Sequence, residues 1–223
     1  MTATESTIRI TAADGHTLDA YLDKPAGARK GGLVILQEIF GMTDQLKSVA
    51  RSFAADGYET ILPALYDRKA QGTVVPFDKP DDGRDIMNGL DKAKVMLDIG
   101  AAVKAVDGPG GVSVLGYCWG GGLVVGAACE YDLRGAVSYY GTRLPTYLDR
   151  KPKCDLLFHF GETDTMNTPP AVIAQVREAI PGAETYIYAA GHAFANDARK
   201  TYVPEAAIPA RERSLAFLDR HHA

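Results

Sequence analysis

Short apolar runs alternate with segments of helical periodicity along most of the chain. Residues 33–36 form a continuous apolar run (Leu-Val-Ile-Leu), which is typical of a strand buried on both faces. After this run, Thr43 precedes apolar residues that recur at helical spacing over residues 46–54, so we expect Thr43 to cap a helix that ends at Gly57. Strands that alternate with helices predict an α/β protein, in which a mostly parallel central sheet carries helices on both faces.

The same alternation extends toward both ends of the chain. Residues 7–11 and 17–22 flank Asp14-Gly15 and predict a β-hairpin. Further strands are expected at residues 58–62, 112–117, 136–139, 156–160 and 185–188, and further helices at residues 85–106, 123–130, 171–180 and 205–220. Residues 67–84 are irregular and rich in Gly, Pro and Asp, so they are the candidate lid over a site. The pattern contains no linker or repeat, and we expect a single domain over residues 1–223.

Composition and charge exclude several classes of protein. The chain has 24 Lys and Arg against 28 Asp and Glu, whereas nucleic-acid binders usually carry a basic excess. The N-terminal residues lack the pattern of a secretory signal, and no apolar stretch approaches the roughly 18 residues of a membrane span. The three cysteines form no C-x-x-C pair, so neither disulfides nor a zinc site is expected. We expect a cytoplasmic protein, monomeric, without metal, cofactor, nucleic-acid or membrane partner.

The most informative segment surrounds Cys118. A predicted strand runs into Gly116-Tyr117-Cys118-Trp119-Gly120, and a glycine-led helix follows at once. This is the G-x-nucleophile-x-G elbow, with cysteine in the place where serine is commoner. The flanking glycines leave room for a strained turn, and the N-terminus of the following helix favours a thiolate. The alternative is a small buried core cysteine, as we expect for Cys129 and Cys154, but the strand–turn–helix context favours catalysis at Cys118.

A thiolate nucleophile needs a base, and the base needs a group that orients it. His192 lies just past a predicted strand end beside a glycine, whereas His159 lies inside an apolar strand and is expected to be a core residue. Asp164 follows another strand end and is the predicted third member, with Glu162 as the alternative. The order Cys118, Asp164, His192 matches the nucleophile, acid, histidine order of α/β-hydrolases.

The predicted oxyanion hole consists of two backbone N–H groups. One belongs to Trp119, directly after the nucleophile, and the other to Ile39, in the loop after the strand at residues 33–36.

These residues resemble the dienelactone hydrolase (carboxymethylenebutenolidase) family of α/β-hydrolases. The resemblance spans essentially the whole chain. The shared stretches are Gln37 to Gly41, Leu65-Tyr66 with Arg68 and Gly72-Thr73, Gly116 to Gly121, Tyr139 to Gly141, Gly161 to Asp164, and Ala190 to Ala195.

The resemblance implies a triad of Cys118, His192 and Asp164. It also implies that Glu38 lies beside the thiol and takes its proton when substrate arrives, and that Arg68 binds a substrate carboxylate. Tyr140 and Asn196 fall in the region that the family uses for substrate. The family's dienelactone enzymes carry an arginine four residues after the catalytic histidine, but this chain has Asn196 there, so half of the carboxylate clamp is missing.

The predicted activity is hydrolysis of an enol lactone or another activated ester through an acyl-thioester on Cys118. Asn196 motivates one alternative, a general carboxylesterase or thioesterase of the same fold. The other alternative is a non-catalytic thiol redox sensor, for which Cys129 is the only nearby resolving cysteine.

Overall fold

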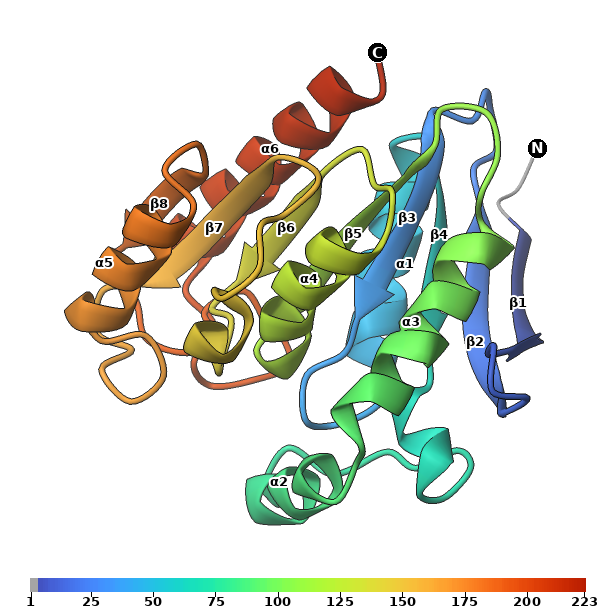
Figure 1. Ribbon diagram of the computed structural model, residues 1–223, viewed down its shortest axis with the longest axis horizontal. Coiled ribbons are helices and arrows are strands. Elements are labelled where there is room, and N and C mark those ends of the chain that lie inside the picture. Colours follow the sequence, from blue (N-terminus) through green and yellow to red (C-terminus); the bar gives the residue numbers. More distant parts are fainter. Residues whose placement is uncertain (1–3) are drawn as a thin grey trace. The chain divides into compact units, whose positions relative to one another are not determined.

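A computed structural model describes residues 4–223 (Figure 1). It divides into two compact units, residues 1–113 and residues 114–223, which we describe separately. The division falls within strand β5 (Val112–Tyr117). The single domain expected from the sequence stays a prediction.

The first unit contains a four-stranded sheet of mixed direction. Its strands are β1 (Thr4–Thr11), β2 (Thr17–Lys24), β4 (Tyr58–Pro63) and β3 (Gly31–Leu36), in that order across the sheet. β1 and β2 form the predicted antiparallel hairpin, β2 pairs antiparallel with β4, and β3 runs parallel to β4. Every residue of β3 is buried, which confirms the interpretation of its apolar run.

Helices cover both faces of this sheet. α1 (Asp44–Ala55) lies behind it and α3 (Lys92–Ala105) in front of it in Figure 1. The hydroxyl oxygen of Thr43 accepts a hydrogen bond from the N–H of Leu46 at 3.3 Å, so Thr43 caps α1 as predicted. Gly57 follows the end of α1 at φ 103°, a conformation that favours glycine.

The helix expected over residues 85–106 is two helices, and this prediction was wrong in extent. α2 (Pro80–Asn88) begins within the segment expected to be irregular, because Pro80 supplies a helical φ at the first turn. Gly89 ends α2, and the Asp91 side chain accepts from Ala93 N–H at 2.8 Å to cap α3. A short helical turn, η1 (Leu65–Arg68), precedes them. Action of this segment as a lid stays a prediction.

The second unit contains a parallel sheet. β5, β6 (Ala136–Tyr139), β7 (Leu156–Gly161) and β8 (Glu184–Tyr188) follow one another in space as in sequence. In Figure 1, α4 (Trp119–Glu130) and α5 (Pro170–Ala179) lie in front of the sheet and α6 (Pro204–His221) lies behind it. A short turn, η2 (Leu144–Tyr147), follows β6. Because the strands run parallel, the loops after β5, β6, β7 and β8 leave from the same sheet edge.

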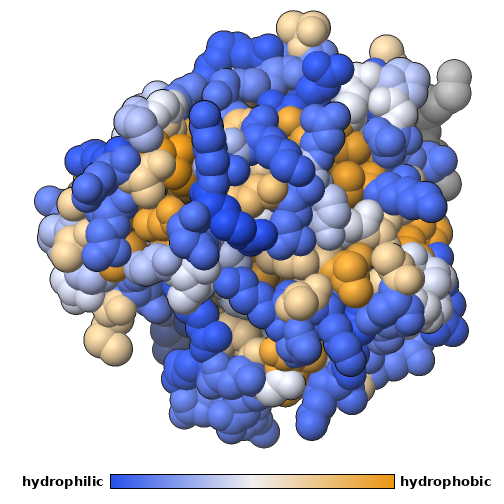
Figure 2. All heavy atoms as spheres, viewed as in Figure 1, coloured by the Kyte–Doolittle hydropathy of each residue, from blue (hydrophilic) through white to orange (hydrophobic). Residues whose placement is uncertain are grey.

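Hydrophilic side chains predominate on the face drawn in Figure 2, and hydrophobic ones are scattered among them. Within residues 4–223, no helix combines the length and the apolar character that crossing a membrane requires.

Candidate active site

Cys118 lies at the junction between β5 and α4, in a strained backbone conformation. Its φ of 54° and ψ of −115° are uncommon for a residue with a side chain. Such strain costs on the order of 1–3 kcal/mol and is concentrated at functional sites. The turn also requires glycine at position 116, because a Cβ there would lie 2.3 Å from the carbonyl oxygen of Gly120. The predicted elbow is therefore present, with its side chain at the sheet edge.

Backbone hydrogen bonds hold Cys118 in this conformation. Its N–H donates to the carbonyl of Tyr139 at 3.0 Å, and its carbonyl accepts from the N–H groups of Gly122 at 3.2 Å and Thr142 at 2.9 Å. The end of β6 and the loop after it thus hold Cys118 from the side. Sequence reasoning missed Thr142, and no local pattern pointed to it.

His192 and Asp164 are hydrogen-bonded to each other. The Nδ1 atom of His192 lies 2.6 Å from Oδ2 of Asp164, while the other carboxylate oxygen accepts from the side-chain amide of Asn167 at 2.9 Å. Burial alone would raise the pKa of Asp164, but hydrogen bonds from His192 and Asn167 lower it below its usual range. Glu162, the alternative acid, is exposed. Asn167 was missed, although its spacing of three residues from Asp164 is typical of an aspartate-centred turn.

The third contact of the triad joins His192 to Cys118. Burial alone would lower the pKa of His192, but the charge on Cys118, the hydrogen bonds to Asp164 and Cys118, and the charge on Asp164 raise it to about 10. A pKa this high means that the imidazole carries a proton at neutral pH. The arrangement is therefore an imidazolium hydrogen-bonded on one side to the Asp164 carboxylate and on the other to Cys118.

Two residues expected near the substrate are buried, and one of them contacts the triad. Tyr140 is fully buried, and its ring packs edge-on against His192 with centroids 5.1 Å apart. Asn196 is also buried, and its Oδ1 accepts from the N–H of Ala198 at 3.1 Å. The structure thus gives Tyr140 a contact with the triad histidine and Asn196 a place in a local turn, while substrate binding by either stays a prediction.

Glu38 and Ile39 follow β3 in the first unit, and both are buried. The side chain of Gln37 anchors this loop, because its Oε1 accepts from the N–H of Leu65 at 3.0 Å. Gly83 of α2 packs tightly against the same loop, since a Cβ at this position would lie 2.0 Å from the carbonyl oxygen of Ile39. The loop is thus held from two sides.

The structure gives Arg68 a different environment from the one expected. Its guanidinium forms ion pairs with Asp98 at 2.6 Å and with Asp14 at 2.9 Å. Nε bonds to Asp98, Nη1 to Asp14 and Nη2 to both, so every guanidinium nitrogen already donates to a carboxylate. The Arg68 guanidinium lowers the pKa of Asp14 to about 2. A substrate carboxylate at Arg68 would have to displace one of these partners.

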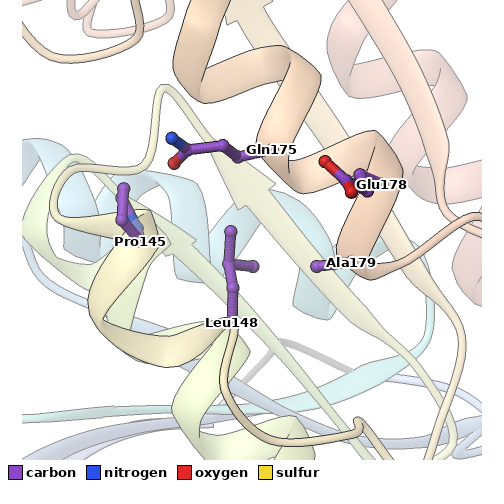
Figure 3. Close-up of a pocket in the computed structure, with 5 residues that line it drawn as sticks. All are labelled: Pro145, Leu148, Gln175, Glu178 and Ala179. Carbon is purple, nitrogen blue, oxygen red and sulfur yellow. The ribbon is translucent and has the colours of Figure 1, made fainter.

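A surface cavity in the second unit lies apart from the triad. Figure 3 shows its lining: Pro145 and Leu148 from η2 and the residue after it, and Gln175, Glu178 and Ala179 from α5. None of the predicted site residues lines this cavity.

Comparison with known proteins shows the family to which the chain belongs. The model of the dienelactone hydrolase family matches residues 18–222. A carboxymethylenebutenolidase of Pseudomonas putida is 34% identical over 226 residues, which cover 95% of this chain and 94% of that protein. Another, from Pseudomonas sp. (strain P51), is 32% identical and covers 96% of this chain and 94% of its own length.

Solved structures agree on the fold. A protein of Klebsiella pneumoniae subsp. pneumoniae MGH 78578 superposes with a TM-score of 0.86 at 24% identity, over 98% of this chain and 99% of its own. A dienelactone hydrolase from Anabaena variabilis ATCC 29413 gives a TM-score of 0.70 at 18% identity, over 99% of both chains. The predicted α/β-hydrolase fold is confirmed. The chain is a carboxylic-ester hydrolase that belongs to the dienelactone hydrolase family.

Proposed function

We propose that this hydrolase opens an enol lactone, or cleaves another activated ester, through an acyl-thioester on Cys118. The observation that carries the proposal is the contact of His192 with both Cys118 and Asp164, which raises the pKa of His192 to about 10. The names of the relatives, carboxymethylenebutenolidases, support a lactone as the substrate class.

In the first half of the reaction, the Cys118 thiolate attacks the carbonyl carbon and the carbonyl π electrons move to oxygen. The backbone N–H of Trp119, the first residue of α4, and that of Ile39 are proposed to stabilise this oxyanion. Collapse of the intermediate breaks the bond from the carbonyl carbon to the enolic oxygen. The enolate oxygen is released and accepts the proton of His192, and the acyl group remains on sulfur. In a lactone the resulting enol stays attached to that acyl group.

In the second half, neutral His192 removes a proton from water as the water oxygen attacks the thioester carbon. The second tetrahedral intermediate expels the thiolate, and Asp164 stabilises the imidazolium that has formed. An enol lactone gives a single keto acid, because its enol stays attached to the acyl group and converts to the ketone, whereas an acyclic enol ester gives a carboxylic acid and a separate ketone. The charges of the resting site are restored.

The choice of cysteine narrows the substrate. A thiolate is a better leaving group than a simple alkoxide, so an intermediate formed from a plain alkyl ester tends to return to substrate. An enolate is stabilised by delocalisation, so the intermediate formed from an enol lactone collapses forward. Glu38, a buried carboxylate, is proposed to act on the thiol whenever the thiol carries a proton.

A general carboxylesterase or thioesterase is the second candidate. It is favoured by the ion pairs that occupy Arg68 and by the neutral Asn196, because both weaken the case for an anionic lactone. The redox-sensor alternative has less support, because burial raises the pKa of the thiol of Cys129, its candidate resolving cysteine.

The experiment compares the kcat/KM values of the purified protein for cis- and trans-dienelactone, p-nitrophenyl acetate and ethyl acetate, before and after alkylation by iodoacetamide. We expect the lactones to be the best substrates and one equivalent of alkylation at Cys118 to abolish turnover. Lactone rates no higher than those for the esters would favour the second candidate. Reaction of Cys118 with iodoacetamide, without turnover of any substrate by the untreated protein, would favour the sensor.

A further inference from the structure

A chain of hydrogen bonds lies near the triad in the second unit, and all of its residues except Arg213 are buried. His159 of β7 is at its centre: Nδ1 lies 2.9 Å from the hydroxyl of Tyr188, and Nε2 lies 2.9 Å from that of Ser214. The Ser214 oxygen is also 2.7 Å from the hydroxyl of Tyr139, and Arg213 donates to the Tyr188 hydroxyl at 3.0 Å. We call these five residues the His159 network. It connects β6, β7 and β8 to α6.

The network fixes one set of proton positions. Ser214 donates its single hydroxyl proton to the carbonyl of Ala210 at 2.9 Å, so Tyr139 and Nε2 of His159 must donate to Ser214. Nδ1 of His159 then accepts from Tyr188, whose oxygen accepts from Arg213. Every bond has one donor and one acceptor when His159 is a neutral imidazole protonated on Nε2.

The surroundings of His159 keep it neutral. Its side chain is fully buried, and burial together with the charge of Arg213 lowers its pKa to about 3. The rings of Tyr139 and Tyr186 flank it, with centroids 4.5 Å and 6.1 Å away. Arg213 lies over the ring of Tyr186 at 4.1 Å. A core made only of apolar side chains would avoid the desolvation of these polar groups, so the network calls for a reason beyond packing.

Residues of this network are hydrogen-bonded to Cys118 and to the starts of the loops that carry Asp164 and His192. The carbonyl of Tyr139 accepts the N–H of Cys118 at 3.0 Å. The carbonyl of Tyr188 accepts the N–H of Glu162 at 2.8 Å and that of Ala190 at 2.7 Å, which start the loops that carry Asp164 and His192.

Tyr140 provides a further connection. The carbonyl of His159 accepts the N–H of Tyr140 at 2.7 Å, and the ring of Tyr140 packs on His192. The ring of Phe194, two residues after His192, contacts Tyr188 with centroids 5.2 Å apart. Contacts from the network therefore converge on the histidine of the triad.

We propose that His159 is a positioning residue for the hydrolysis, which acts through Tyr139 and Tyr188 to hold Cys118, Asp164 and His192 in register. This inference rests on the proposed role of Cys118 as nucleophile. His159 does not act on substrate. Its hydrogen bonds fix the positions of the ends of β6, β7 and β8 relative to one another. Small displacements of reacting groups cost up to about 100-fold in rate, so a loosened network is expected to lower kcat rather than raise KM.

The test pairs two conservative variants on β8. Tyr188→Phe removes the hydroxyl that His159 uses, and Tyr186→Phe removes a hydroxyl outside the network from the same strand. We expect Tyr188→Phe to lower kcat by about 5- to 20-fold and to slow alkylation of Cys118 by iodoacetamide by a similar factor, with KM unchanged. Tyr186→Phe is expected to change neither rate by more than about twofold.

Substitutions of His159 itself provide the second readout. His159→Phe removes both ring nitrogens and is expected to lower kcat by about 10- to 100-fold, while His159→Gln, which keeps a donor and an acceptor, retains more activity. The 15N chemical shifts of His192 in the free protein should move in His159→Phe and Tyr188→Phe but not in Tyr186→Phe. Should His159→Phe fail to fold, Tyr188→Phe still decides.

A purely structural role would lower the melting temperature of these variants while kcat, the alkylation rate and the His192 shifts stayed at wild-type values, and that result overturns the proposal. Failure of the proposed function gives a different result: wild-type enzyme alkylated at Cys118 would still hydrolyse its substrates. The His192 shifts then test positioning without reference to turnover.

Discussion

The protonation state of His192 is the most direct physical test of the site. The rise of its pKa from 6.5 to about 10 corresponds to about 5 kcal/mol in favour of the charged ring. Cys118 raises the pKa of His192 through its charge and through a hydrogen bond, and Asp164 raises it in the same two ways. Replacing Cys118 by serine removes the charge and leaves the carboxylate contact intact. We therefore expect Cys118→Ser to lower the pKa of His192 toward 6.5, with part of the increase retained through Asp164.

The direction of the pH dependence follows from the sign of the shift. A raised pKa keeps the imidazolium up to a pH near 10, so alkylation of Cys118 should lose its dependence on the His192 proton only as the pH passes that value. Long-range 1H–15N correlation spectra recorded from pH 5 to pH 11 follow this proton directly. His159 serves as the internal reference, because it is expected to remain neutral and protonated on Nε2 throughout this range. A His192 ring that titrates near 6.5 in the wild type, or identically in Cys118→Ser, would refute the reasoning.

Three further predictions concern residues around the site. Arg68→Ala leaves a buried carboxylate without its cation and should lower the free energy of unfolding by about 3–5 kcal/mol in urea denaturation, against less than about 1 kcal/mol for the exposed ion pair lost in Arg84→Ala. If Arg68 instead binds substrate, the KM for an anionic ester will rise relative to that for a neutral ester. Gly116→Ala should destabilise the protein by about 1–3 kcal/mol in the same assay, because the added methyl group would meet backbone atoms. Gly182→Ala serves as the control, because a methyl group there meets nothing within 4 Å. Equal effects of the two substitutions would contradict the close packing of the elbow. Glu38→Gln should slow iodoacetamide alkylation by less than about threefold if His192 holds the thiol proton at rest, whereas a large loss would make Glu38 the proton acceptor.

The features of the fold that follow from local pattern could be predicted from the sequence. The fully apolar run of β3 and the Thr43 cap of α1 depend on neighbours within a few residues, and both are found. The break between α2 and α3 was missed because helical periodicity continues across it, and only the capping by Gly89 and Asp91 divides it. In that segment, capping outweighed periodicity.

The candidate site likewise contains features that a local pattern predicts and features that depend on residues far away in sequence. The elbow at Cys118 has a local signature, and the order of the triad along the chain pointed to Asp164 and His192. The partners of Arg68 lie 54 and 30 residues away in sequence, on the hairpin and on α3, so no motif around Arg68 could indicate them. Its role was inferred from resemblance alone, and the ion pairs supply a structural function that resemblance did not suggest. His159 was correctly expected to be buried, but its hydrogen-bond network depends on α6 and could not be predicted from its own strand.

The resting charge state also bears on which substrates the site suits. In the proposed mechanism His192 holds a proton before substrate arrives, so it first gives that proton away and becomes a base only afterwards. An enolate leaving group accepts the proton, so His192 is neutral when water must be activated in the second half of the reaction. An alkyl thiolate leaving group needs a proton much less, and would leave His192 charged and unable to act as a base until solvent removed the proton. Proton balance therefore favours esters and lactones of enols over thioesters, and deacylation of a common acyl group should be slower after a thioester than after an enol ester.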